Sequence, residues 1–282
     1  MTSASARIVI LPIAAWASIG LASSMSGDEL ELGTLTPIFA DGLESGNIFV
    51  WDAGPGPTQS CPFTPEANGF FSLDSEQSSY VVRLPVDYDL QNPVPQRLLV
   101  ALHGCGGTAL DFAGWAAVPA VLRATQDYLA ISVGGREGEC WELDTDGALV
   151  AAAIEHVRSC FYVHQRQIVL AGYSSGGLLA YKLAMEDSLT WAGVLIEVSL
   201  LSAAVGGNTD AVLDAAAWKI NVAHSARLED EIFDIDFVRL DRDKMLERNF
   251  PLVYRELPGG HVGTSADWSD YLLPQMATWS TP

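Results

Sequence analysis

One pentapeptide constrains this chain more than any other feature: residues 172–176 read GYSSG, a G-x-S-x-G motif. It directly follows the apolar run 167–171, which predicts a strand, and precedes residues 177–185, which predict a helix. A nucleophile elbow carries its serine through a strained turn, and small neighbouring residues let the backbone make that turn. We therefore interpret Ser174 as a nucleophile at the carboxyl end of a strand. The alternative is an ordinary loop with Ser174 as a helix cap.

A second glycine-rich turn lies upstream, at the end of another predicted strand. The buried-strand run 97–102 ends in residues 103–107, which read HGCGG. Acyl transfer requires backbone N–H donors aimed at the oxyanion as it forms, and glycine lets the backbone come that close. We expect the N–H groups of Cys105 and Ser175 to form this oxyanion hole, because the residue after the nucleophile normally supplies one donor. A plain turn is the alternative.

The general base is expected among the five histidines of the chain. The run 251–257 alternates like a strand and breaks at residues 258–261, PGGH, so His261 stands on a loop just past the last predicted strand. His224 ends another predicted strand and is the competitor. Triads built on a nucleophile elbow run in the order serine, acid, histidine, and this order favours His261.

The triad acid is expected on the loop that follows the predicted strand 218–224. This loop contains four carboxylates: Glu229, Asp230, Glu231 and Asp234. We place the acid at Asp230, because the apolar pair Ile232 and Phe233 can hold the loop against the core. Glu229 is the alternative, since glutamate also serves in this role.

The rest of the chain alternates between predicted strands and helices. Further strands are expected at residues 69–73, 79–84, 128–133 and 192–200, and helices near 109–124, 146–159 and 238–247. Asp146 is expected to cap the second of these helices. The alternation predicts an α/β fold with a mostly parallel sheet of about eight strands and helices on both faces.

These elements together resemble the α/β-hydrolase fold. The segments HGCGG, Cys140-Trp141, GYSSG and PGGH each follow a predicted strand. In this order they are similar to secreted bacterial serine esterases of the feruloyl esterase, acetylxylan esterase and polyhydroxybutyrate depolymerase-like group. The resemblance covers about residues 69–280. A longer acidic stretch replaces the usual short turn after the seventh strand.

The resemblance implies an enzyme that hydrolyses plant-polymer or aromatic esters through an acyl-enzyme. Trp141 and Trp115 are the candidate substrate contacts, although tryptophans in this fold more often belong to the core. A polyhydroxybutyrate depolymerase or short-chain carboxylesterase would use the same chemistry, and a serine peptidase shares the fold. A catalytically silent cell-surface binding protein is the alternative outside enzymes.

The N-terminal residues 1–22 indicate a secretory signal peptide: Arg7 precedes a short apolar core and small residues at the cut. A membrane-spanning helix needs a longer apolar run, so we expect a secreted protein, extracellular or periplasmic, without a stable membrane partner. Retention as an uncleaved anchor is the alternative. Residues 23–64 are expected to form an acidic, linker-like arm with one short strand near 48–50. The catalytic domain is expected at 65–282.

The amino-acid composition limits the classes of partner and cofactor that we expect this chain to bind. Of 282 residues, 49% are hydrophobic, which is enough for one large core. The formal net charge of -20 would repel phosphate backbones, so we expect no nucleic-acid partner. The four cysteines lack paired metal-ligand spacing, and we expect neither a metal nor an organic cofactor.

Export would allow these cysteines to form disulfides. Cys105 and Cys140 both follow strands at the carboxyl edge, and these strands are neighbours in the fold that the chain resembles. Cys160 lies past the far end of a predicted helix, about 20 Å from Cys140 at about 1.5 Å per residue, which is too far for a disulfide. We expect Cys105–Cys140, and Cys61–Cys160 by elimination.

Overall fold

The computed structural model describes residues 54–282 of the chain. The predicted signal peptide and the short strand expected near residues 48–50 lie outside the described residues. The strands are β1 Thr64–Pro65, β2 Phe71–Asp74, β3 Ser79–Arg83, β4 Gln96–Leu102, β5 Leu129–Val133, β6 Val163–Tyr173, β7 Gly193–Glu197, β8 Asn221–Arg227 and β9 Leu252–Leu257.

Helices of very different lengths alternate with these strands. The α-helices are α2 Ala109–Phe112, α3 Gly147–Cys160, α4 Ser175–Glu186, α5 Leu201–Ala204, α6 Thr209–Ala215, α7 Ile235–Glu247, α8 Ser265–Asp267 and α9 Leu273–Gln275. The π-helical turns are η4 Ala113–Ala117 and η6 Trp268–Leu272, and the 3-10 turns are η3 Ala67–Gly69, η5 Ala120–Leu122 and η7 Met276–Thr278.

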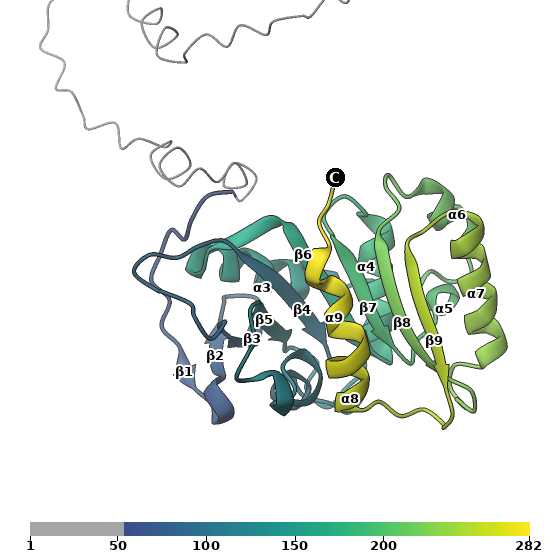
Figure 1. Cartoon of the computed structure of the whole chain (residues 1–282), viewed down its shortest axis with the longest axis horizontal. Helices are drawn as coiled ribbons and strands as arrows, with labels where there is room; N and C mark the ends of the chain where they lie inside the picture. The colour runs from purple at the N-terminus through teal and green to yellow at the C-terminus, as the bar shows by residue number, and fades with distance from the viewer. Residues whose placement is uncertain (1–53) are drawn as a thin grey trace, which may run out of the picture.

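Within residues 54–282, all the strands join one sheet in the order β1-β2-β3-β5-β4-β6-β7-β8-β9 (Figure 1). The pairs β1–β2, β2–β3 and β3–β5 are antiparallel, and every other neighbouring pair is parallel. This arrangement confirms the expected α/β-hydrolase fold. The sheet has nine strands rather than about eight, because the two-residue β1 extends its antiparallel edge.

The two faces of the sheet carry separate hydrophobic clusters. In β4, Leu98, Val100 and Leu102 face one cluster, whereas Leu99 and Ala101 face the other, as the two-residue period of a strand requires. Both sets are fully buried. A central parallel strand therefore reads as a continuous apolar run, which is why β4 was recognisable in the sequence.

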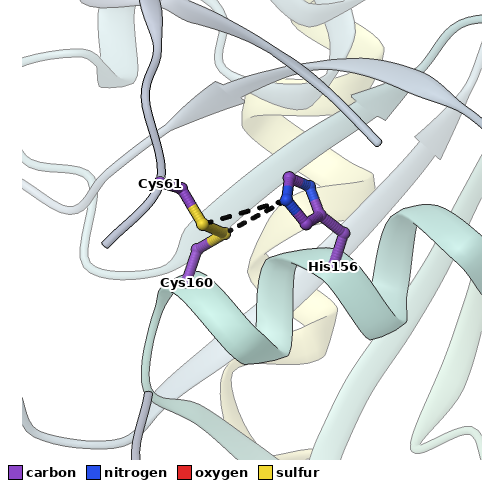
Figure 2. A group of neighbouring side chains, drawn as sticks. All are labelled: Cys61, His156 and Cys160. Carbon is purple, nitrogen blue, oxygen red and sulfur yellow. Dashed lines mark hydrogen bonds between the residues drawn. A yellow bond between two sulfur atoms is a disulfide. The ribbon is translucent and has the colours of Figure 1, made fainter. Parts of the chain in front are cut away.

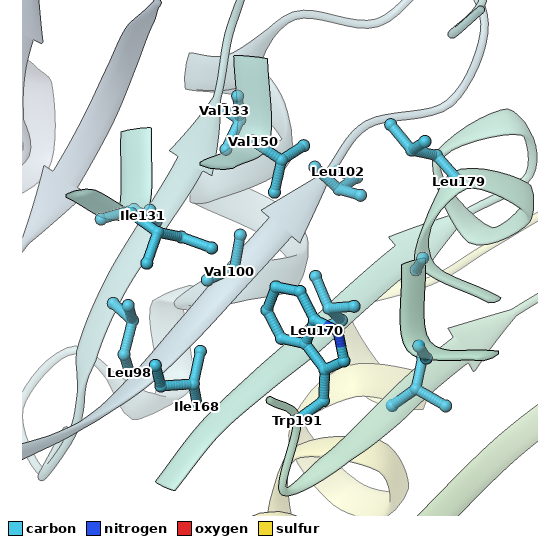
Figure 3. Packing of buried hydrophobic residues seen from close by; sticks show 14 of the residues in the cluster. Leu98, Val100, Leu102, Ile131, Val133, Val150, Ile168, Leu170, Leu179 and Trp191 are labelled. Carbon is cyan, nitrogen blue, oxygen red and sulfur yellow. The ribbon is translucent and has the colours of Figure 1, made fainter. Parts of the chain in front are cut away.

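Different helices close the two faces. The first cluster includes side chains of α3, α4 and α5, and Figure 3 shows Val150 and Leu179 packing from these helices toward the strands. The second cluster includes side chains of α2, η4, η6 and α9, and in Figure 1 the C-terminal helical segment crosses the front of the sheet. The carboxyl ends of the parallel strands stay at one edge between these layers.

Two sequence-based expectations about helices were wrong in detail. The helix expected at 109–124 is broken into α2, η4 and η5, because Pro119 has no N–H and holds Val118 at φ -139°, outside the helical region. Asp146 occupies the cap position of α3 but makes no capping hydrogen bond. Its carboxylate instead binds Arg136 Nε at 2.8 Å and accepts from Glu142 N at 2.7 Å.

Both expected disulfides, Cys105–Cys140 and Cys61–Cys160, are confirmed. Cys61–Cys160 joins the end of the N-terminal arm to the end of α3, and the His156 imidazole lies against both sulfurs (Figure 2). Because the sulfurs bind each other, metal coordination by this group would first require reduction of the disulfide. The described part of the arm is thereby tied to the domain.

The helices between residues 54 and 282 are all too short or too polar to cross a membrane.

Candidate active site

Ser174 occupies a sharp turn between β6 and α4. Its backbone has φ 52° and ψ -117°, a conformation that non-glycine residues rarely adopt. A Cβ at Gly172 would lie 2.3 Å from Gly176 O, and one at Gly176 would lie 2.1 Å from Leu102 O. Only glycine fits at these two positions, so the GYSSG spacing follows from the close approach of strand, turn and helix.

The structure brings Ser174, His261 and Asp230 into one hydrogen-bonded chain. Ser174 Oγ lies 2.8 Å from His261 Nε2, and His261 Nδ1 lies 2.9 Å and 3.0 Å from the two Asp230 carboxylate oxygens. The Asp230 side chain is buried, whereas the His261 side chain is 10% exposed, so the imidazole remains partly accessible. This geometry allows His261 to take a proton from Ser174 while Asp230 orients the imidazole.

The four carboxylates of the acidic loop make different contacts. Asp230 binds the histidine ring and also accepts from the N–H groups of Ile232 and Phe233 at 2.8 Å and 2.9 Å. Glu229 accepts from the backbone N–H of Gly259, and Glu231 accepts from that of His261.

The fourth carboxylate, Asp234, caps α7 through Asp236 N. Asp230 is therefore the member of the four that contacts the imidazole ring of His261, and the other three contact backbone N–H groups.

The HGCGG turn lies directly beside Ser174. A Cβ added at Gly104 would be 3.3 Å from Ser174 Cβ. Among the described residues, the backbone N–H groups of Cys105 and Ser175 are not engaged by a hydrogen-bond acceptor, so both are available to a ligand. These are the two donors expected from the sequence.

The dipeptide Cys140-Trp141 supports this turn from two sides. Cys140 forms the disulfide to Cys105, and Trp141 Nε1 donates to His103 O at 2.8 Å. The Trp141 ring is only 5% exposed and packs 5.0 Å from the His103 ring. The structure therefore gives Trp141 a supporting position behind the turn and leaves little of its surface for the substrate contact expected from the sequence.

Trp115 lies differently, on the wall of a cavity of about 230 Å³ that runs along the HGCGG turn. Phe112, Tyr173, Thr108 and Asp111 line the same cavity. The Trp115 ring meets those of Phe112 and Tyr173 edge to face, with centroids 5.2 Å and 5.5 Å apart. Three aromatic side chains thus form an apolar wall next to the candidate nucleophile.

His224 lies far inside the sheet. The sequence placed it at the end of a strand, but β8 continues to Arg227, so His224 is in mid-strand and buried. Its Nδ1 is 3.0 Å from the Tyr181 hydroxyl, and burial lowers its pKa to about 3. His224 makes no contact with Ser174 in the structure.

A buried carboxylate near the site was missed in the sequence. Glu197 ends β7, is fully buried, and contacts the segment that follows His261. Burial raises its pKa well above the ordinary value, and the neighbouring Asp267 carboxylate adds to this effect. A single acid inside the apolar run 192–200 is the signal that could have identified it.

Three solved structures of similar fold are distant from this chain in sequence. The S-formylglutathione hydrolase of Staphylococcus aureus gives a TM-score of 0.57 at 15% identity, over 77% of this chain and 98% of that one. A ferulic acid esterase gives 0.56 at 15%, over 72% and 93%. A thermophilic esterase of Thermogutta terrifontis gives 0.53 at 16%, over 70% and 86%.

The sequence matches no protein-family model and no curated protein. At 15–16% identity, the likeness to these three structures establishes the α/β-hydrolase fold that carries the Ser174–His261–Asp230 arrangement.

Proposed function

We propose that this protein is a serine esterase that hydrolyses carboxylic esters through a covalent acyl-enzyme. The observation that carries the proposal is the hydrogen-bonded chain from Ser174 through His261 to Asp230, beside a glycine-rich turn with available N–H donors. Nucleophile, base, orienting acid and oxyanion donors are the four parts that acyl transfer needs.

In the proposed first half-reaction, Ser174 Oγ attacks the ester carbonyl as His261 Nε2 takes its proton. The N–H groups of Cys105 and Ser175 hold the oxyanion of the tetrahedral intermediate. This intermediate collapses, and the alcohol leaves with the proton from His261. Asp230 keeps the Nδ1–H tautomer and stabilises the imidazolium formed in between.

In the second half-reaction, water attacks the acyl-enzyme and His261 again acts as base and then as acid. The acid product leaves, and Ser174 regains its proton.

For the substrate, we propose an aromatic or plant-polymer ester of the feruloyl or acetylxylan type. The aromatic wall of Phe112, Trp115 and Tyr173 supports an aromatic or short acyl group in the 230 Å³ cavity. Short-chain esters and hydroxybutyrate oligomers are the alternatives. The leader-like residues 1–22 and the two disulfides support export to an oxidising compartment.

The central test is Ser174→Ala. We expect p-nitrophenyl acetate hydrolysis to fall by about 10⁴-fold or more, with an unchanged melting temperature and circular dichroism spectrum. A fluorophosphonate probe should label the wild type at Ser174. Labelling at the neighbouring Ser175, or turnover retained in the variant, would contradict the assignment.

A substrate panel then separates the proposed activities. It contains methyl ferulate, acetylated xylan, short p-nitrophenyl esters, a hydroxybutyrate oligomer and an aminoacyl amide. Preference for methyl ferulate or acetylated xylan supports the proposed class, and amide cleavage would indicate a peptidase. A protein that hydrolyses none of them and resists the probe would be a binding protein on a hydrolase fold.

A further inference from the structure

The segment that ends β7 holds the backbone of Ser174 from both sides. Ser174 N donates to Glu197 O at 3.2 Å, and Ser199 Oγ donates to Ser174 O at 3.0 Å. Between these two contacts, buried Val198 has φ 44°, a left-handed conformation that is costly for a β-branched residue. Such strain persists only where surrounding contacts impose it, and here those contacts fix the nucleophile.

The side chain of Glu197 extends from the same segment to the loop that carries His261. Its Oε1 accepts from Thr264 N at 3.0 Å, and its Oε2 accepts from Trp268 Nε1 at 2.5 Å. A Cβ at Gly263 would lie 2.5 Å from Oε2, so the loop packs directly on the carboxylate. One residue therefore contacts both the nucleophile's backbone and the chain just after the base.

The Glu197 carboxylate is fully buried among other charged side chains. Arg227 lies 3.6 Å from Glu197 Oε1, and the same guanidinium pairs with Asp267, which also binds Arg255. A buried carboxylate is costly, and an apolar residue in its place is often neutral or stabilising for the fold. What an apolar residue cannot supply is two acceptor oxygens, one for each of the two N–H donors on the histidine segment.

We propose that Glu197 is a positioning residue that fixes His261 opposite Ser174 by joining the nucleophile's strand to the histidine loop. This inference rests on the proposed esterase function, because it assigns His261 the role of base. It goes beyond the triad by naming the group that sets the distance between two of its members. A misplacement of about 1 Å in such a pair can cost about 100-fold in rate.

The first test is Glu197→Gln, which keeps the volume and leaves one acceptor oxygen instead of two. We expect kcat for p-nitrophenyl acetate to fall about 10- to 100-fold, with KM within about threefold, because the base moves while the binding cavity stays. The low-field proton NMR signal of the His261–Asp230 hydrogen bond should broaden or disappear.

The matched control is Asp241→Asn, at another buried carboxylate, whose hydrogen-bond partners Ser202 and Thr209 lie outside the proposed triad. Asp241 accepts from Ser202 N at 2.7 Å and from Thr209 at 3.3 Å, so its loss also breaks a buried contact of a carboxylate. We expect both variants to have a lower melting temperature, because each weakens a buried hydrogen-bonded contact, but Asp241→Asn should keep wild-type kcat and an intact low-field signal. This control separates loss of stability from loss of positioning.

A second variant keeps the proposal testable if Glu197→Gln does not fold. Gly263→Ala introduces a methyl group 2.5 Å from Glu197 Oε2 and 2.8 Å from Tyr173 Cε2, which must displace the loop without removing a charge. We expect the same loss of kcat and of the NMR signal. Its control, Gly56→Ala, places the methyl group in open space and should change neither.

Failure of the positioning role and failure of the proposed function give different results. A folded Glu197→Gln with wild-type kcat and low-field signal overturns the positioning role, as does an active Gly263→Ala if Glu197→Gln fails to fold. A wild type without hydrolysis or probe labelling overturns the proposed function instead. In that case the NMR signal of the variants still decides whether Glu197 positions His261.

Discussion

Two histidines in this protein lie at nearly the same distance from a hydroxyl group. His261 Nε2 is 2.8 Å from Ser174 Oγ at the carboxyl edge of the sheet, and His224 Nδ1 is 3.0 Å from the Tyr181 hydroxyl inside it. The contacts at the second ring nitrogen differ. His261 Nδ1 meets the Asp230 carboxylate, whereas His224 Nε2 has no partner among residues 54–282.

This difference separates the proposed base from a core residue. A base must become an imidazolium during the reaction, and a buried carboxylate on its other nitrogen stabilises that charge. His224 has no such partner, and burial lowers its pKa to about 3, so it stays neutral at ordinary pH. A short distance to a hydroxyl group is therefore a weak criterion for a catalytic histidine. The role of each histidine depends on the partner of its second ring nitrogen and on its access to substrate.

The sharpest test of this contrast is the same substitution at both histidines. We expect His261→Gln to lower kcat by about 10⁶-fold, as loss of a triad base does, and His224→Gln to leave kcat within about twofold of the wild type after correction for folded fraction. Esterase kinetics on both variants measure this. An inactive His224→Gln beside an active His261→Gln would assign the base to His224.

Asp230→Asn tests the partner of the second nitrogen. The amide can still accept from the loop N–H groups of Ile232 and Phe233, but its NH₂ group would face His261 Nδ1 and favour the wrong tautomer. We expect kcat to fall by about 10⁴-fold with little change in KM.

Glu229→Gln is the control for Asp230→Asn, since the Glu229 carboxylate accepts from the backbone N–H of Gly259 and not from the His261 ring. A collapse of kcat at Glu229 with normal turnover in Asp230→Asn would move the acid to Glu229.

The parts of the fold that the sequence predicted correctly depend on local pattern. The carboxyl-terminal halves of β4 and β6 are buried, so their apolar runs are continuous. Gly172 is required for a local reason, because a Cβ there would meet Gly176, whereas a Cβ at Gly104 or Gly176 would meet residues about 70 positions away. The Cys105–Cys140 disulfide was predicted from the strand edges together with the strand order of the fold that the chain resembles, and Cys61–Cys160 by elimination. The apolar runs and the spacing of the glycines, in contrast, can be recognised without knowing the tertiary contacts.

The parts that were missed depend on contacts between distant residues. β8 extends to Arg227, three residues past His224, because the chain pairs with β9 there, and no local signal marks this end. Asp146 looked like a cap, but Arg136 binds its carboxylate. The Glu197 carboxylate accepts hydrogen bonds from Thr264 and Trp268, which lie about 70 residues later in the chain. The local sequence therefore offered one indication that Glu197 is unusual, its charge within an apolar run.

Buried His224 should affect how the free energy of unfolding depends on pH. The pKa of His224 is about 3 in the folded chain, against an ordinary 6.5, because burial disfavours the charged ring. Between these values the unfolded chain binds a proton that the folded chain does not. Lowering the pH through this window therefore reduces the free energy of unfolding, by about 1.4 kcal/mol per pH unit.

Urea unfolding of the wild type and His224→Gln at pH 6.5 and pH 5 measures this effect. We expect the wild type to lose about 2 kcal/mol more than the variant over this interval. Equal losses in the two proteins would show that His224 does not resist protonation, and its contrast with His261 would then rest on geometry alone.

The smallest loss of kcat is expected for a substitution of Glu231, whose exposed carboxylate contacts the His261 segment from the solvent side. Its carboxylate accepts from the backbone N–H of His261 at 3.1 Å and is exposed to solvent, so water can replace it. We expect Glu231→Ala to lower kcat by about two- to tenfold, the range of one modest hydrogen bond, with an unchanged melting temperature. Asp234→Ala, which removes the cap of α7, should do the reverse and lower the melting temperature with kcat unchanged. If both substitutions change stability alone, the acidic loop acts on the base through Asp230 and not through its backbone contacts.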